Sequence, residues 1–168
     1  TATALHVNAG SQLGVFSDYN QYHVTGDGTL FQWGNESYSR IGDFFYATAL
    51  AEHALNGAPQ FVDIASHDYH LQTGASGIDA GHPDAAYANE PTPNGGYVNL
   101  GAYGDTEQAS LSADQYMLVI APDGAEVWPA TQTFEIRWRT HIILAADAVS
   151  EGRLQRLLHA YSTDNPGI

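Results

Sequence analysis

Residues 56–106 read NGAPQFVDIASHDYHLQTGASGIDAGHPDAAYANEPTPNGGYVNLGAYGDT, and this stretch decides the fold that the sequence predicts. Its apolar runs are short, as at Phe61 and Val62 or at Val98 and Leu100, and Gly, Pro, Asn or Asp separates them every few residues. Such spacing is too close for a helix and is typical of short strands joined by tight turns. We therefore expect a mainly β fold with many turns and little helix.

Four phrases within this stretch resemble a known family. They are PQFVD (59–63), DYHLQTGASGIDAG (68–81), EPTPNGG (90–96) and NLGAYGDT (99–106). Together they resemble the closing segment of secreted right-handed parallel β-helix proteins, the pectate-lyase-like superfamily in its broad sense. The resemblance implies a right-handed parallel β-helix over residues 1–106 and a location outside the cell or on a bacterial cell surface. A coil takes roughly two dozen residues, so about four coils would fit.

The residues before this stretch are expected to add coils. Residues 4–33 alternate apolar and polar positions in short spells broken by Gly and Asp, which is typical of strands. In SDYN (17–20), Asp18 and Asn20 suit a bend of the backbone better than a ligand site. The opening TATALHVNAG begins in mid-pattern, so we expect further coils upstream in a longer protein. We also expect self-association, through the open end of the coils or through exchange of the C-terminal tail from Met117 onwards.

One helix is expected to interrupt the coils. Residues 37–55, SYSRIGDFFYATALAEHAL, place Ile41, Phe44 and Phe45 on one apolar side. Ser37 could cap this helix, and the Asn-Gly pair at 56–57 would end it. We expect the helix to cover the side or the end of the coils.

The sequence changes character after residue 106. Residues 107–115 resemble a linker, and residues 116–168 begin like an Ig-like module with strands expected at 117–120 and 133–138. A sandwich needs roughly seven strands, and the remaining residues do not supply them. Residues 145–161, AADAVSEGRLQRLLHAY, predict an amphipathic helix instead. The predicted C-terminal part is therefore a partial β-sandwich followed by an atypical helix.

Composition narrows the classes of partner. Nineteen acidic residues against five basic ones give a net charge of -14, which opposes binding to nucleic acid and to anionic membranes. An acidic glycan would also be repelled unless a cation bridged it to the protein, and calcium is the natural ion for that role. The chain has no cysteine, so disulfides and a cysteine nucleophile are excluded. No apolar run is long enough to span a bilayer.

Two kinds of polar site are considered. Asp68, His70, His82 and Asp84 could hold a divalent ion, since imidazole and carboxylate groups are common metal ligands. The alternative is that these side chains form hydrogen bonds at turns. If the chain is an enzyme, Asp68 and Asp79 are the candidate carboxylates, within the sequence pairs Asp63 with Asp68 and Asp79 with Asp84.

The basic residues argue against a complete lyase site. A polysaccharide lyase of the related type typically relies on Lys or Arg, often together with calcium. This chain has no lysine, and Arg40 is the only arginine between residues 1 and 136. The four aromatic residues that could stack on sugar rings, if they are exposed, are Tyr19, Tyr22, Trp33 and Tyr87. The alternative is that these rings pack in the interior of the fold.

Three functions follow from these observations. The first is a non-catalytic terminal part of an exported or cell-surface, carbohydrate-associated protein with a structural or adhesion role. The second is a piece of a polysaccharide lyase or glycoside hydrolase, and the third is a glycan-binding module. An exposed row of aromatic rings would favour glycan binding, and carboxylates clustered in a groove would favour the enzyme.

Overall fold

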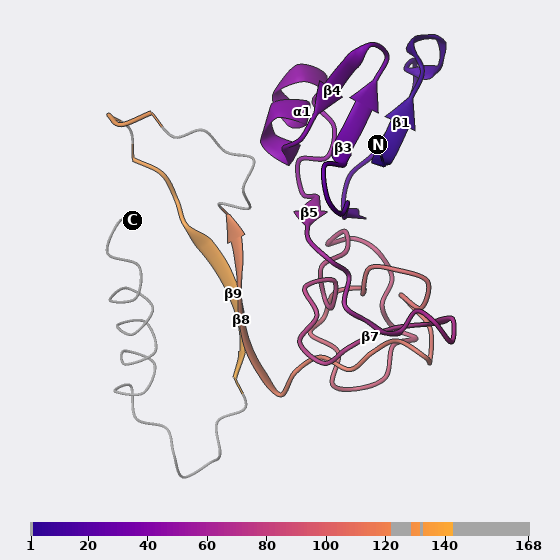
Figure 1. The fold of residues 1–168 in the computed structure, drawn as a ribbon. Coiled ribbons are helices and arrows are strands. Elements are labelled where there is room, and N and C mark those ends of the chain that lie inside the picture. Colours follow the sequence, from indigo (N-terminus) through magenta and orange to yellow (C-terminus); the bar gives the residue numbers. More distant parts are fainter. Residues whose placement is uncertain (1, 122–128, 132, 143–168) are drawn as a thin grey trace.

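The computed structural model describes residues 2–121, 129–131 and 133–142 (Figure 1). Short strands dominate these residues, with one α-helix and one turn of 3-10 helix. In chain order the elements are β1 (Thr3–Val7), η1 (Ala9–Ser11), β2 (Gln21–Tyr22), β3 (Thr29–Trp33), β4 (Glu36–Tyr38), α1 (Ile41–Thr48), β5 (Leu55–Asn56), β6 (Phe61–Asp63), β7 (Asp68–Leu71), β8 (Gln115–Ala121) and β9 (Arg137–Ile142).

The N-terminal part is built on a small mixed sheet in the order β1-β3-β4. Strand β1 runs parallel to β3, whereas β4 runs antiparallel to β3. Gly34, with φ of +61°, lies in the two-residue connection between β3 and β4, where a positive φ matches the twist of a hairpin. A second parallel pair joins β2 to β5.

The helix lies inside the predicted range but is much shorter. Ser37 belongs to β4 rather than capping a helix, and no side-chain hydrogen bond caps α1 at Arg40. Ala49 ends the helix in the left-handed conformation and donates its N–H to the Phe45 carbonyl. The next residues bond to the segment around β2 instead: the N–H of Ala51 donates to the Ser17 carbonyl, and β5 pairs with β2. Long-range pairing therefore replaces the last turns of the predicted helix.

Aromatic packing makes the hydrophobic core of the N-terminal part. Phe31 of β3 and Phe44 of α1 are fully buried, and their rings stack at 4.1 Å between centroids. Trp33 and Tyr38 contact Phe44 edge-on, and Tyr22 contacts Phe31 in the same way. Burying large rings against each other is the main stabilising term available to so small a sheet. Helix α1 thus covers the β1-β3-β4 sheet mainly through Phe44, with Ile41 packed against the same core.

The predicted right-handed parallel β-helix is wrong. The described strands form one sheet of three strands and three sheets of two, and no closed or solenoid sheet is formed among them. Two pairings are antiparallel within residues 29–71, and no strand lies between β7 and β8. The four phrases that resemble the family therefore form mostly turns and loops. Turn-rich sequence specifies local reversals, but it does not specify which strands pair over long distances.

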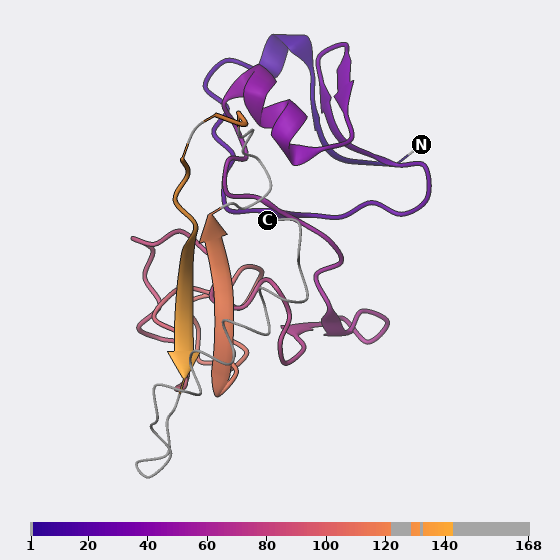
Figure 2. The same cartoon turned by 90° about the vertical axis from the view of Figure 1, so that its left-hand side faces the viewer.

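The C-terminal described part is an antiparallel pair of β8 and β9, whose two arrows run side by side in Figure 2. Strand β8 covers the strand expected at 117–120, whereas β9 begins near the end of the one expected at 133–138. These two strands are the only part of the expected β-sandwich that the structure describes. The helix expected at 145–161 lies outside the described residues. None of the described helices is long and apolar enough to cross a membrane.

Replacing Phe44 with alanine tests the aromatic core. Phe44→Ala removes a buried ring that contacts three others, so the free energy of unfolding should fall by about 3–5 kcal/mol. Tyr46→Ala is the matched control, because Tyr46 lies on the same helix but is 57% exposed; its cost should stay within about 1 kcal/mol. Urea unfolding followed by circular dichroism measures both values. Equal losses in the two variants would contradict a core centred on Phe44.

Candidate functional site

Four buried polar side chains hold the loops between β7 and β8. Asp79, Glu90, Asn99 and Ser112 are each about 5% exposed or less. They come from separate turns within residues 72–114, where the structure has no regular strand. A buried polar group is costly unless it is hydrogen-bonded. The partners of these four side chains therefore decide whether they form a reactive site or a structural one.

Asp79 is held by groups of its own chain. Its Oδ1 accepts hydrogen bonds from the Gly95 N–H at 3.1 Å and from the Ser112 hydroxyl at 2.9 Å. The N–H of Asp79 donates to Asn99 Oδ1 at 2.8 Å. A Cβ at Gly95 would collide with the Asp79 carboxylate and the Tyr116 hydroxyl, so only glycine lets the backbone approach so closely. This candidate carboxylate thus joins three turns.

Glu90 has the same kind of environment. Its Oε1 accepts the N–H of Asn99 at 2.8 Å and the N–H of Asp105 at 2.9 Å. The Asn99 side-chain amide then donates to the Ser110 carbonyl at 2.7 Å. Because Asn99 bonds to both carboxylate-bearing segments, Asp79 and Glu90 belong to one buried polar network. Its donors are mainly backbone amides that no strand pairing satisfies.

Asp68 and His70 lie on the same side of β7, because residues two apart in a strand point to the same face. Their side chains are hydrogen-bonded to each other. The side chain and the backbone N–H of His70 hold the pKa of Asp68 below its ordinary value. The imidazole ring of His70 also stacks on Tyr103, with 4.0 Å between centroids. This group links β7 to the loop at Tyr103.

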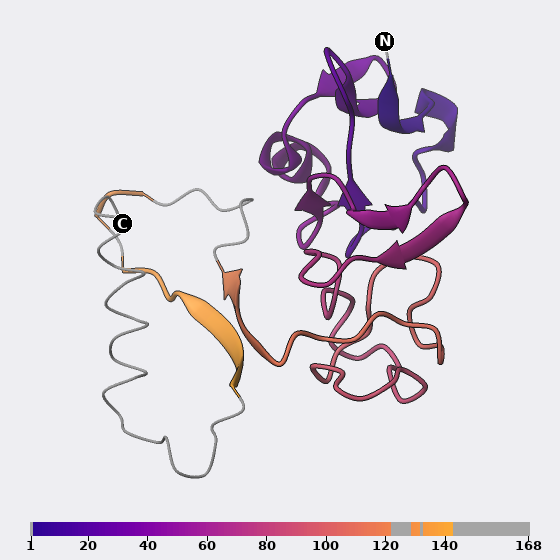
Figure 3. The ribbon, with the colours of Figure 1, turned by 60° about the horizontal axis from the view of Figure 1, so that its bottom comes forward.

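Asp63 faces Asp68 across the β6–β7 hairpin, whose two strands lie side by side in Figure 3. The hydroxyl and N–H of Ser66, with the N–H of Ala65, donate to Asp63. Hydrogen bonds from Ser66 hold the pKa of Asp63 below its ordinary value. The exposed Asp63 and the half-buried Asp68 therefore both accept hydrogen bonds from residues close to them in the chain.

The structure does not bring Asp68, His70, His82 and Asp84 together as a metal site. His82 and Asp84 are exposed, and the Asp84 N–H donates to His82 Nδ1 at 3.1 Å. Within residues 2–121, 129–131 and 133–142, no group of three or more His, Asp or Glu side chains could hold a metal ion. The Asp79 and Asp84 pair is likewise divided between a buried and an exposed position. Asp68 and His70 thus lie in strand β7, and His82 and Asp84 lie in the loops after it.

The four aromatic candidates for sugar stacking occupy different environments. Tyr22 is buried in the core and Trp33 packs against it. Tyr19 is half-buried and stacks on the His53 ring at 4.7 Å between centroids. Tyr87 is 37% exposed. The four rings therefore form no common flat row.

The sequence reasoning missed a pair formed by Asp18 and His53. Asp18 Oδ2 accepts from His53 Nδ1 at 2.8 Å, and Asp18 Oδ1 accepts the His53 N–H at 2.7 Å. Burial raises the pKa of Asp18, but the hydrogen bonds from His53 and from the Tyr19 N–H outweigh burial and hold this pKa below its ordinary value. The two residues are 35 positions apart in the sequence, so no local sequence pattern predicts that they form a pair. It fastens the bend at Asp18 to the chain after α1.

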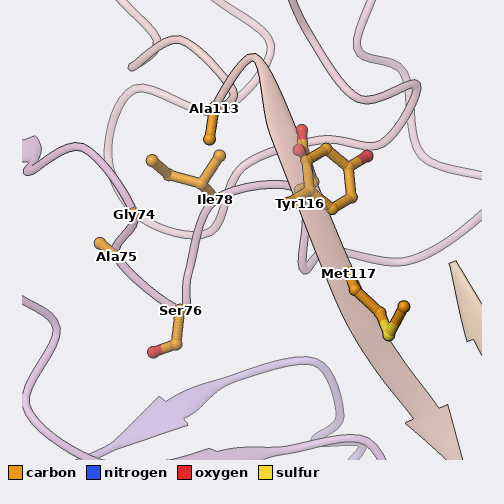
Figure 4. A pocket seen from close by; sticks show the side chains of 8 residues that line it. Gly74, Ala75, Ser76, Ile78, Ala113, Tyr116 and Met117 are labelled. Atoms are coloured by element: carbon orange, nitrogen blue, oxygen red, sulfur yellow. The ribbon is translucent and has the colours of Figure 1, made fainter. Parts of the chain in front are cut away.

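A pocket of about 160 Å³ lies between the loop at residues 74–79 and β8. Figure 4 shows Ile78 and Ala113 on one side of it and Tyr116 and Met117 of β8 on the other. Asp79 is the only carboxylate among the described residues that line it. The lining is otherwise made of small, apolar or hydroxyl-bearing side chains.

No protein family, curated protein or solved structure matches the chain. A functional proposal therefore depends on the described geometry and on the resemblance carried by the four phrases.

Replacing Glu90 tests whether the network is structural. Glu90→Ala leaves the buried N–H of Asn99 and the partly buried N–H of Asp105 without their acceptor, so we expect a loss of about 3 kcal/mol in the free energy of unfolding. Glu107→Ala is the matched control, since Glu107 is exposed, and it should change stability by no more than about 0.5 kcal/mol. Chemical denaturation monitored by circular dichroism measures both. A Glu90→Ala protein as stable as the control would rule out a structural role.

The Asp18 and His53 pair predicts a pH dependence of stability. Since the pKa of Asp18 is lowered on folding, its ionised form stabilises the protein above the unfolded pKa of about 3.9, and this contribution is lost as pH falls through the lower folded pKa. Asp18→Asn should therefore cost about 1 kcal/mol at pH 7, and the difference from wild type should shrink below about pH 4.

Asp27→Asn is the control for this experiment, because Asp27 is an exposed turn residue and its replacement removes the same charge. Thermal unfolding of the three proteins between acidic and neutral pH measures the effect. A difference between Asp18→Asn and wild type that does not change with pH would contradict the role of the ionised carboxylate.

Proposed function

We propose that this chain is a non-catalytic, structural part of an exported or cell-surface, carbohydrate-associated protein. The observation that carries the proposal is the hydrogen bonding of its carboxylates. Asp79 and Glu90 are buried and bonded to groups of their own chain, and Asp63 and Asp68 bond to adjacent residues. A general acid or base must instead reach the atom of the substrate that gains or loses a proton.

The pocket beside β8 also supports a structural role. Glycoside hydrolysis generally uses two carboxylates that flank the scissile bond, and the part of the chain that the structure describes supplies one to this pocket, Asp79. A β-elimination needs a base together with a cation that neutralises the substrate acid. Arg40, the only arginine before residue 137, precedes α1 and does not line the pocket.

The association with carbohydrate and the location outside the cell rest on the resemblance of the four phrases to secreted carbohydrate-active proteins. The acidic composition is compatible with neutral glycans, and with acidic glycans where calcium bridges the two. We therefore take a polysaccharide as the proposed partner and calcium as the proposed bridging ion.

Incubation with a panel of neutral and acidic polysaccharides, with and without calcium, tests this function. Because no second carboxylate or cation accompanies Asp79 among the described residues that line the pocket, we expect neither reducing ends nor unsaturated products above the level of a blank without protein. A commercial hydrolase and a commercial lyase serve as positive controls for the two assays.

Two outcomes would change the assignment. Sustained turnover that Asp68→Ala or Asp79→Ala abolishes, with the circular dichroism spectrum unchanged, would make the chain a hydrolase or lyase. Saturable binding of one polysaccharide without turnover would make it a glycan-binding module, and Tyr87→Ala compared with Tyr22→Phe would then locate the contact.

A further inference from the structure

Strand β1 is an edge strand of the described three-stranded sheet. It is the last member of the β1-β3-β4 order, and β3 is its only strand partner within the described residues. Figure 1 shows β1 at the outer side of the sheet, with the turn that follows it lying beyond its end. An edge strand presents a row of unpaired N–H and C=O groups, so it can accept another strand.

The usual protections of an edge strand are missing from β1. Proteins discourage edge pairing with charged side chains, proline or a bulge on the outer strand. The sequence TALHV has no Asp, Glu, Lys, Arg or proline, and its register with β3 runs without a shift. Thr3, Ala4 and His6 are exposed. Nothing in the strand itself therefore opposes pairing.

Charge distinguishes this part of the chain from the rest. Residues 1–17 contain no Asp, Glu, Lys or Arg, the longest such stretch in a chain of net charge -14. Two copies repel each other wherever their acidic surfaces meet, and this repulsion is weakest where no acidic residue lies. Leu13 and Phe16, in the same segment, are 100% and 84% exposed. An uncharged edge strand is thus followed in the chain by two large apolar side chains that are almost fully exposed.

We propose that the β1 edge, defined as residues 2–16, is the contact surface for a second copy of this chain. The two β1 strands pair antiparallel about a two-fold axis, which joins the two three-stranded sheets into one continuous sheet. Such an arrangement is self-complementary and closes after two copies. Leu13 and Phe16 lose water-exposed apolar area in the same contact. This inference does not depend on the proposed function.

The association constant tests the proposal directly. Sedimentation velocity of the full chain at increasing concentration should show a monomer and dimer in equilibrium. His6→Lys places a charge on the exposed face of β1, and Leu13→Lys places one on a fully exposed side chain whose replacement leaves the core intact. Each should weaken the dimer about tenfold or more. Ile64→Lys is the control, because Ile64 is 63% exposed on the β6–β7 hairpin and its replacement adds the same charge.

Hydrogen exchange with peptide-level readout locates the contact. We expect the amides of residues 3–7 to become more protected as concentration rises, while those of β6 and β7 do not change. A monomer at every concentration overturns the proposal, as does a dimer that Ile64→Lys weakens as much as Leu13→Lys. Protection of β1 that does not vary with concentration overturns it as well, since the edge would then be covered within one chain. Growth beyond a dimer would contradict the two-fold arrangement.

Discussion

The satisfaction of buried backbone amides by two carboxylates is the constraint on which the middle of this structure depends. Between β7 and β8 the chain reverses repeatedly and forms no strand, so most of its amides cannot be paired in a ladder. Asp79 and Glu90 accept several of them at once. Asp79, which the sequence offers as a candidate catalytic carboxylate, and Glu90 therefore hold the loops of this structure in place.

The two parts of the molecule are stabilised by different physics. In the N-terminal part, the stacked rings of Phe31 and Phe44 bury apolar area between a sheet and a helix. In the loop part, few large apolar side chains are buried, and directed hydrogen bonds take their place. Hydrogen bonds to ionised groups are stronger than neutral ones but demand fixed geometry. This difference explains why one part forms regular elements while the other consists of turns.

Local features of the structure were readable in the sequence, and long-range ones were not. The strand near Met117, the helix near Phe44 and the shared side of Asp68 and His70 follow from periodicity alone. The prediction of parallel coils was wrong because turn residues specify where a chain reverses, but they do not specify which strand pairs with which. The burial of Asp79 and its hydrogen bond with Ser112, which is 33 residues away in the sequence, depend on long-range contacts of this kind. The same holds for Asp18 and His53.

The left-handed backbone at Ala49 and Ala51 limits which side chains can replace these two residues during evolution. Both residues have positive φ without being glycine, a conformation that costs little for Gly, Asn or Asp and much more for β-branched side chains. Substitution by valine or isoleucine at these two positions would be selected against although each adds only methyl groups to alanine. Relatives of this protein should therefore carry small or amide side chains there, and two such positions directly after helix α1 are a signature for recognising them.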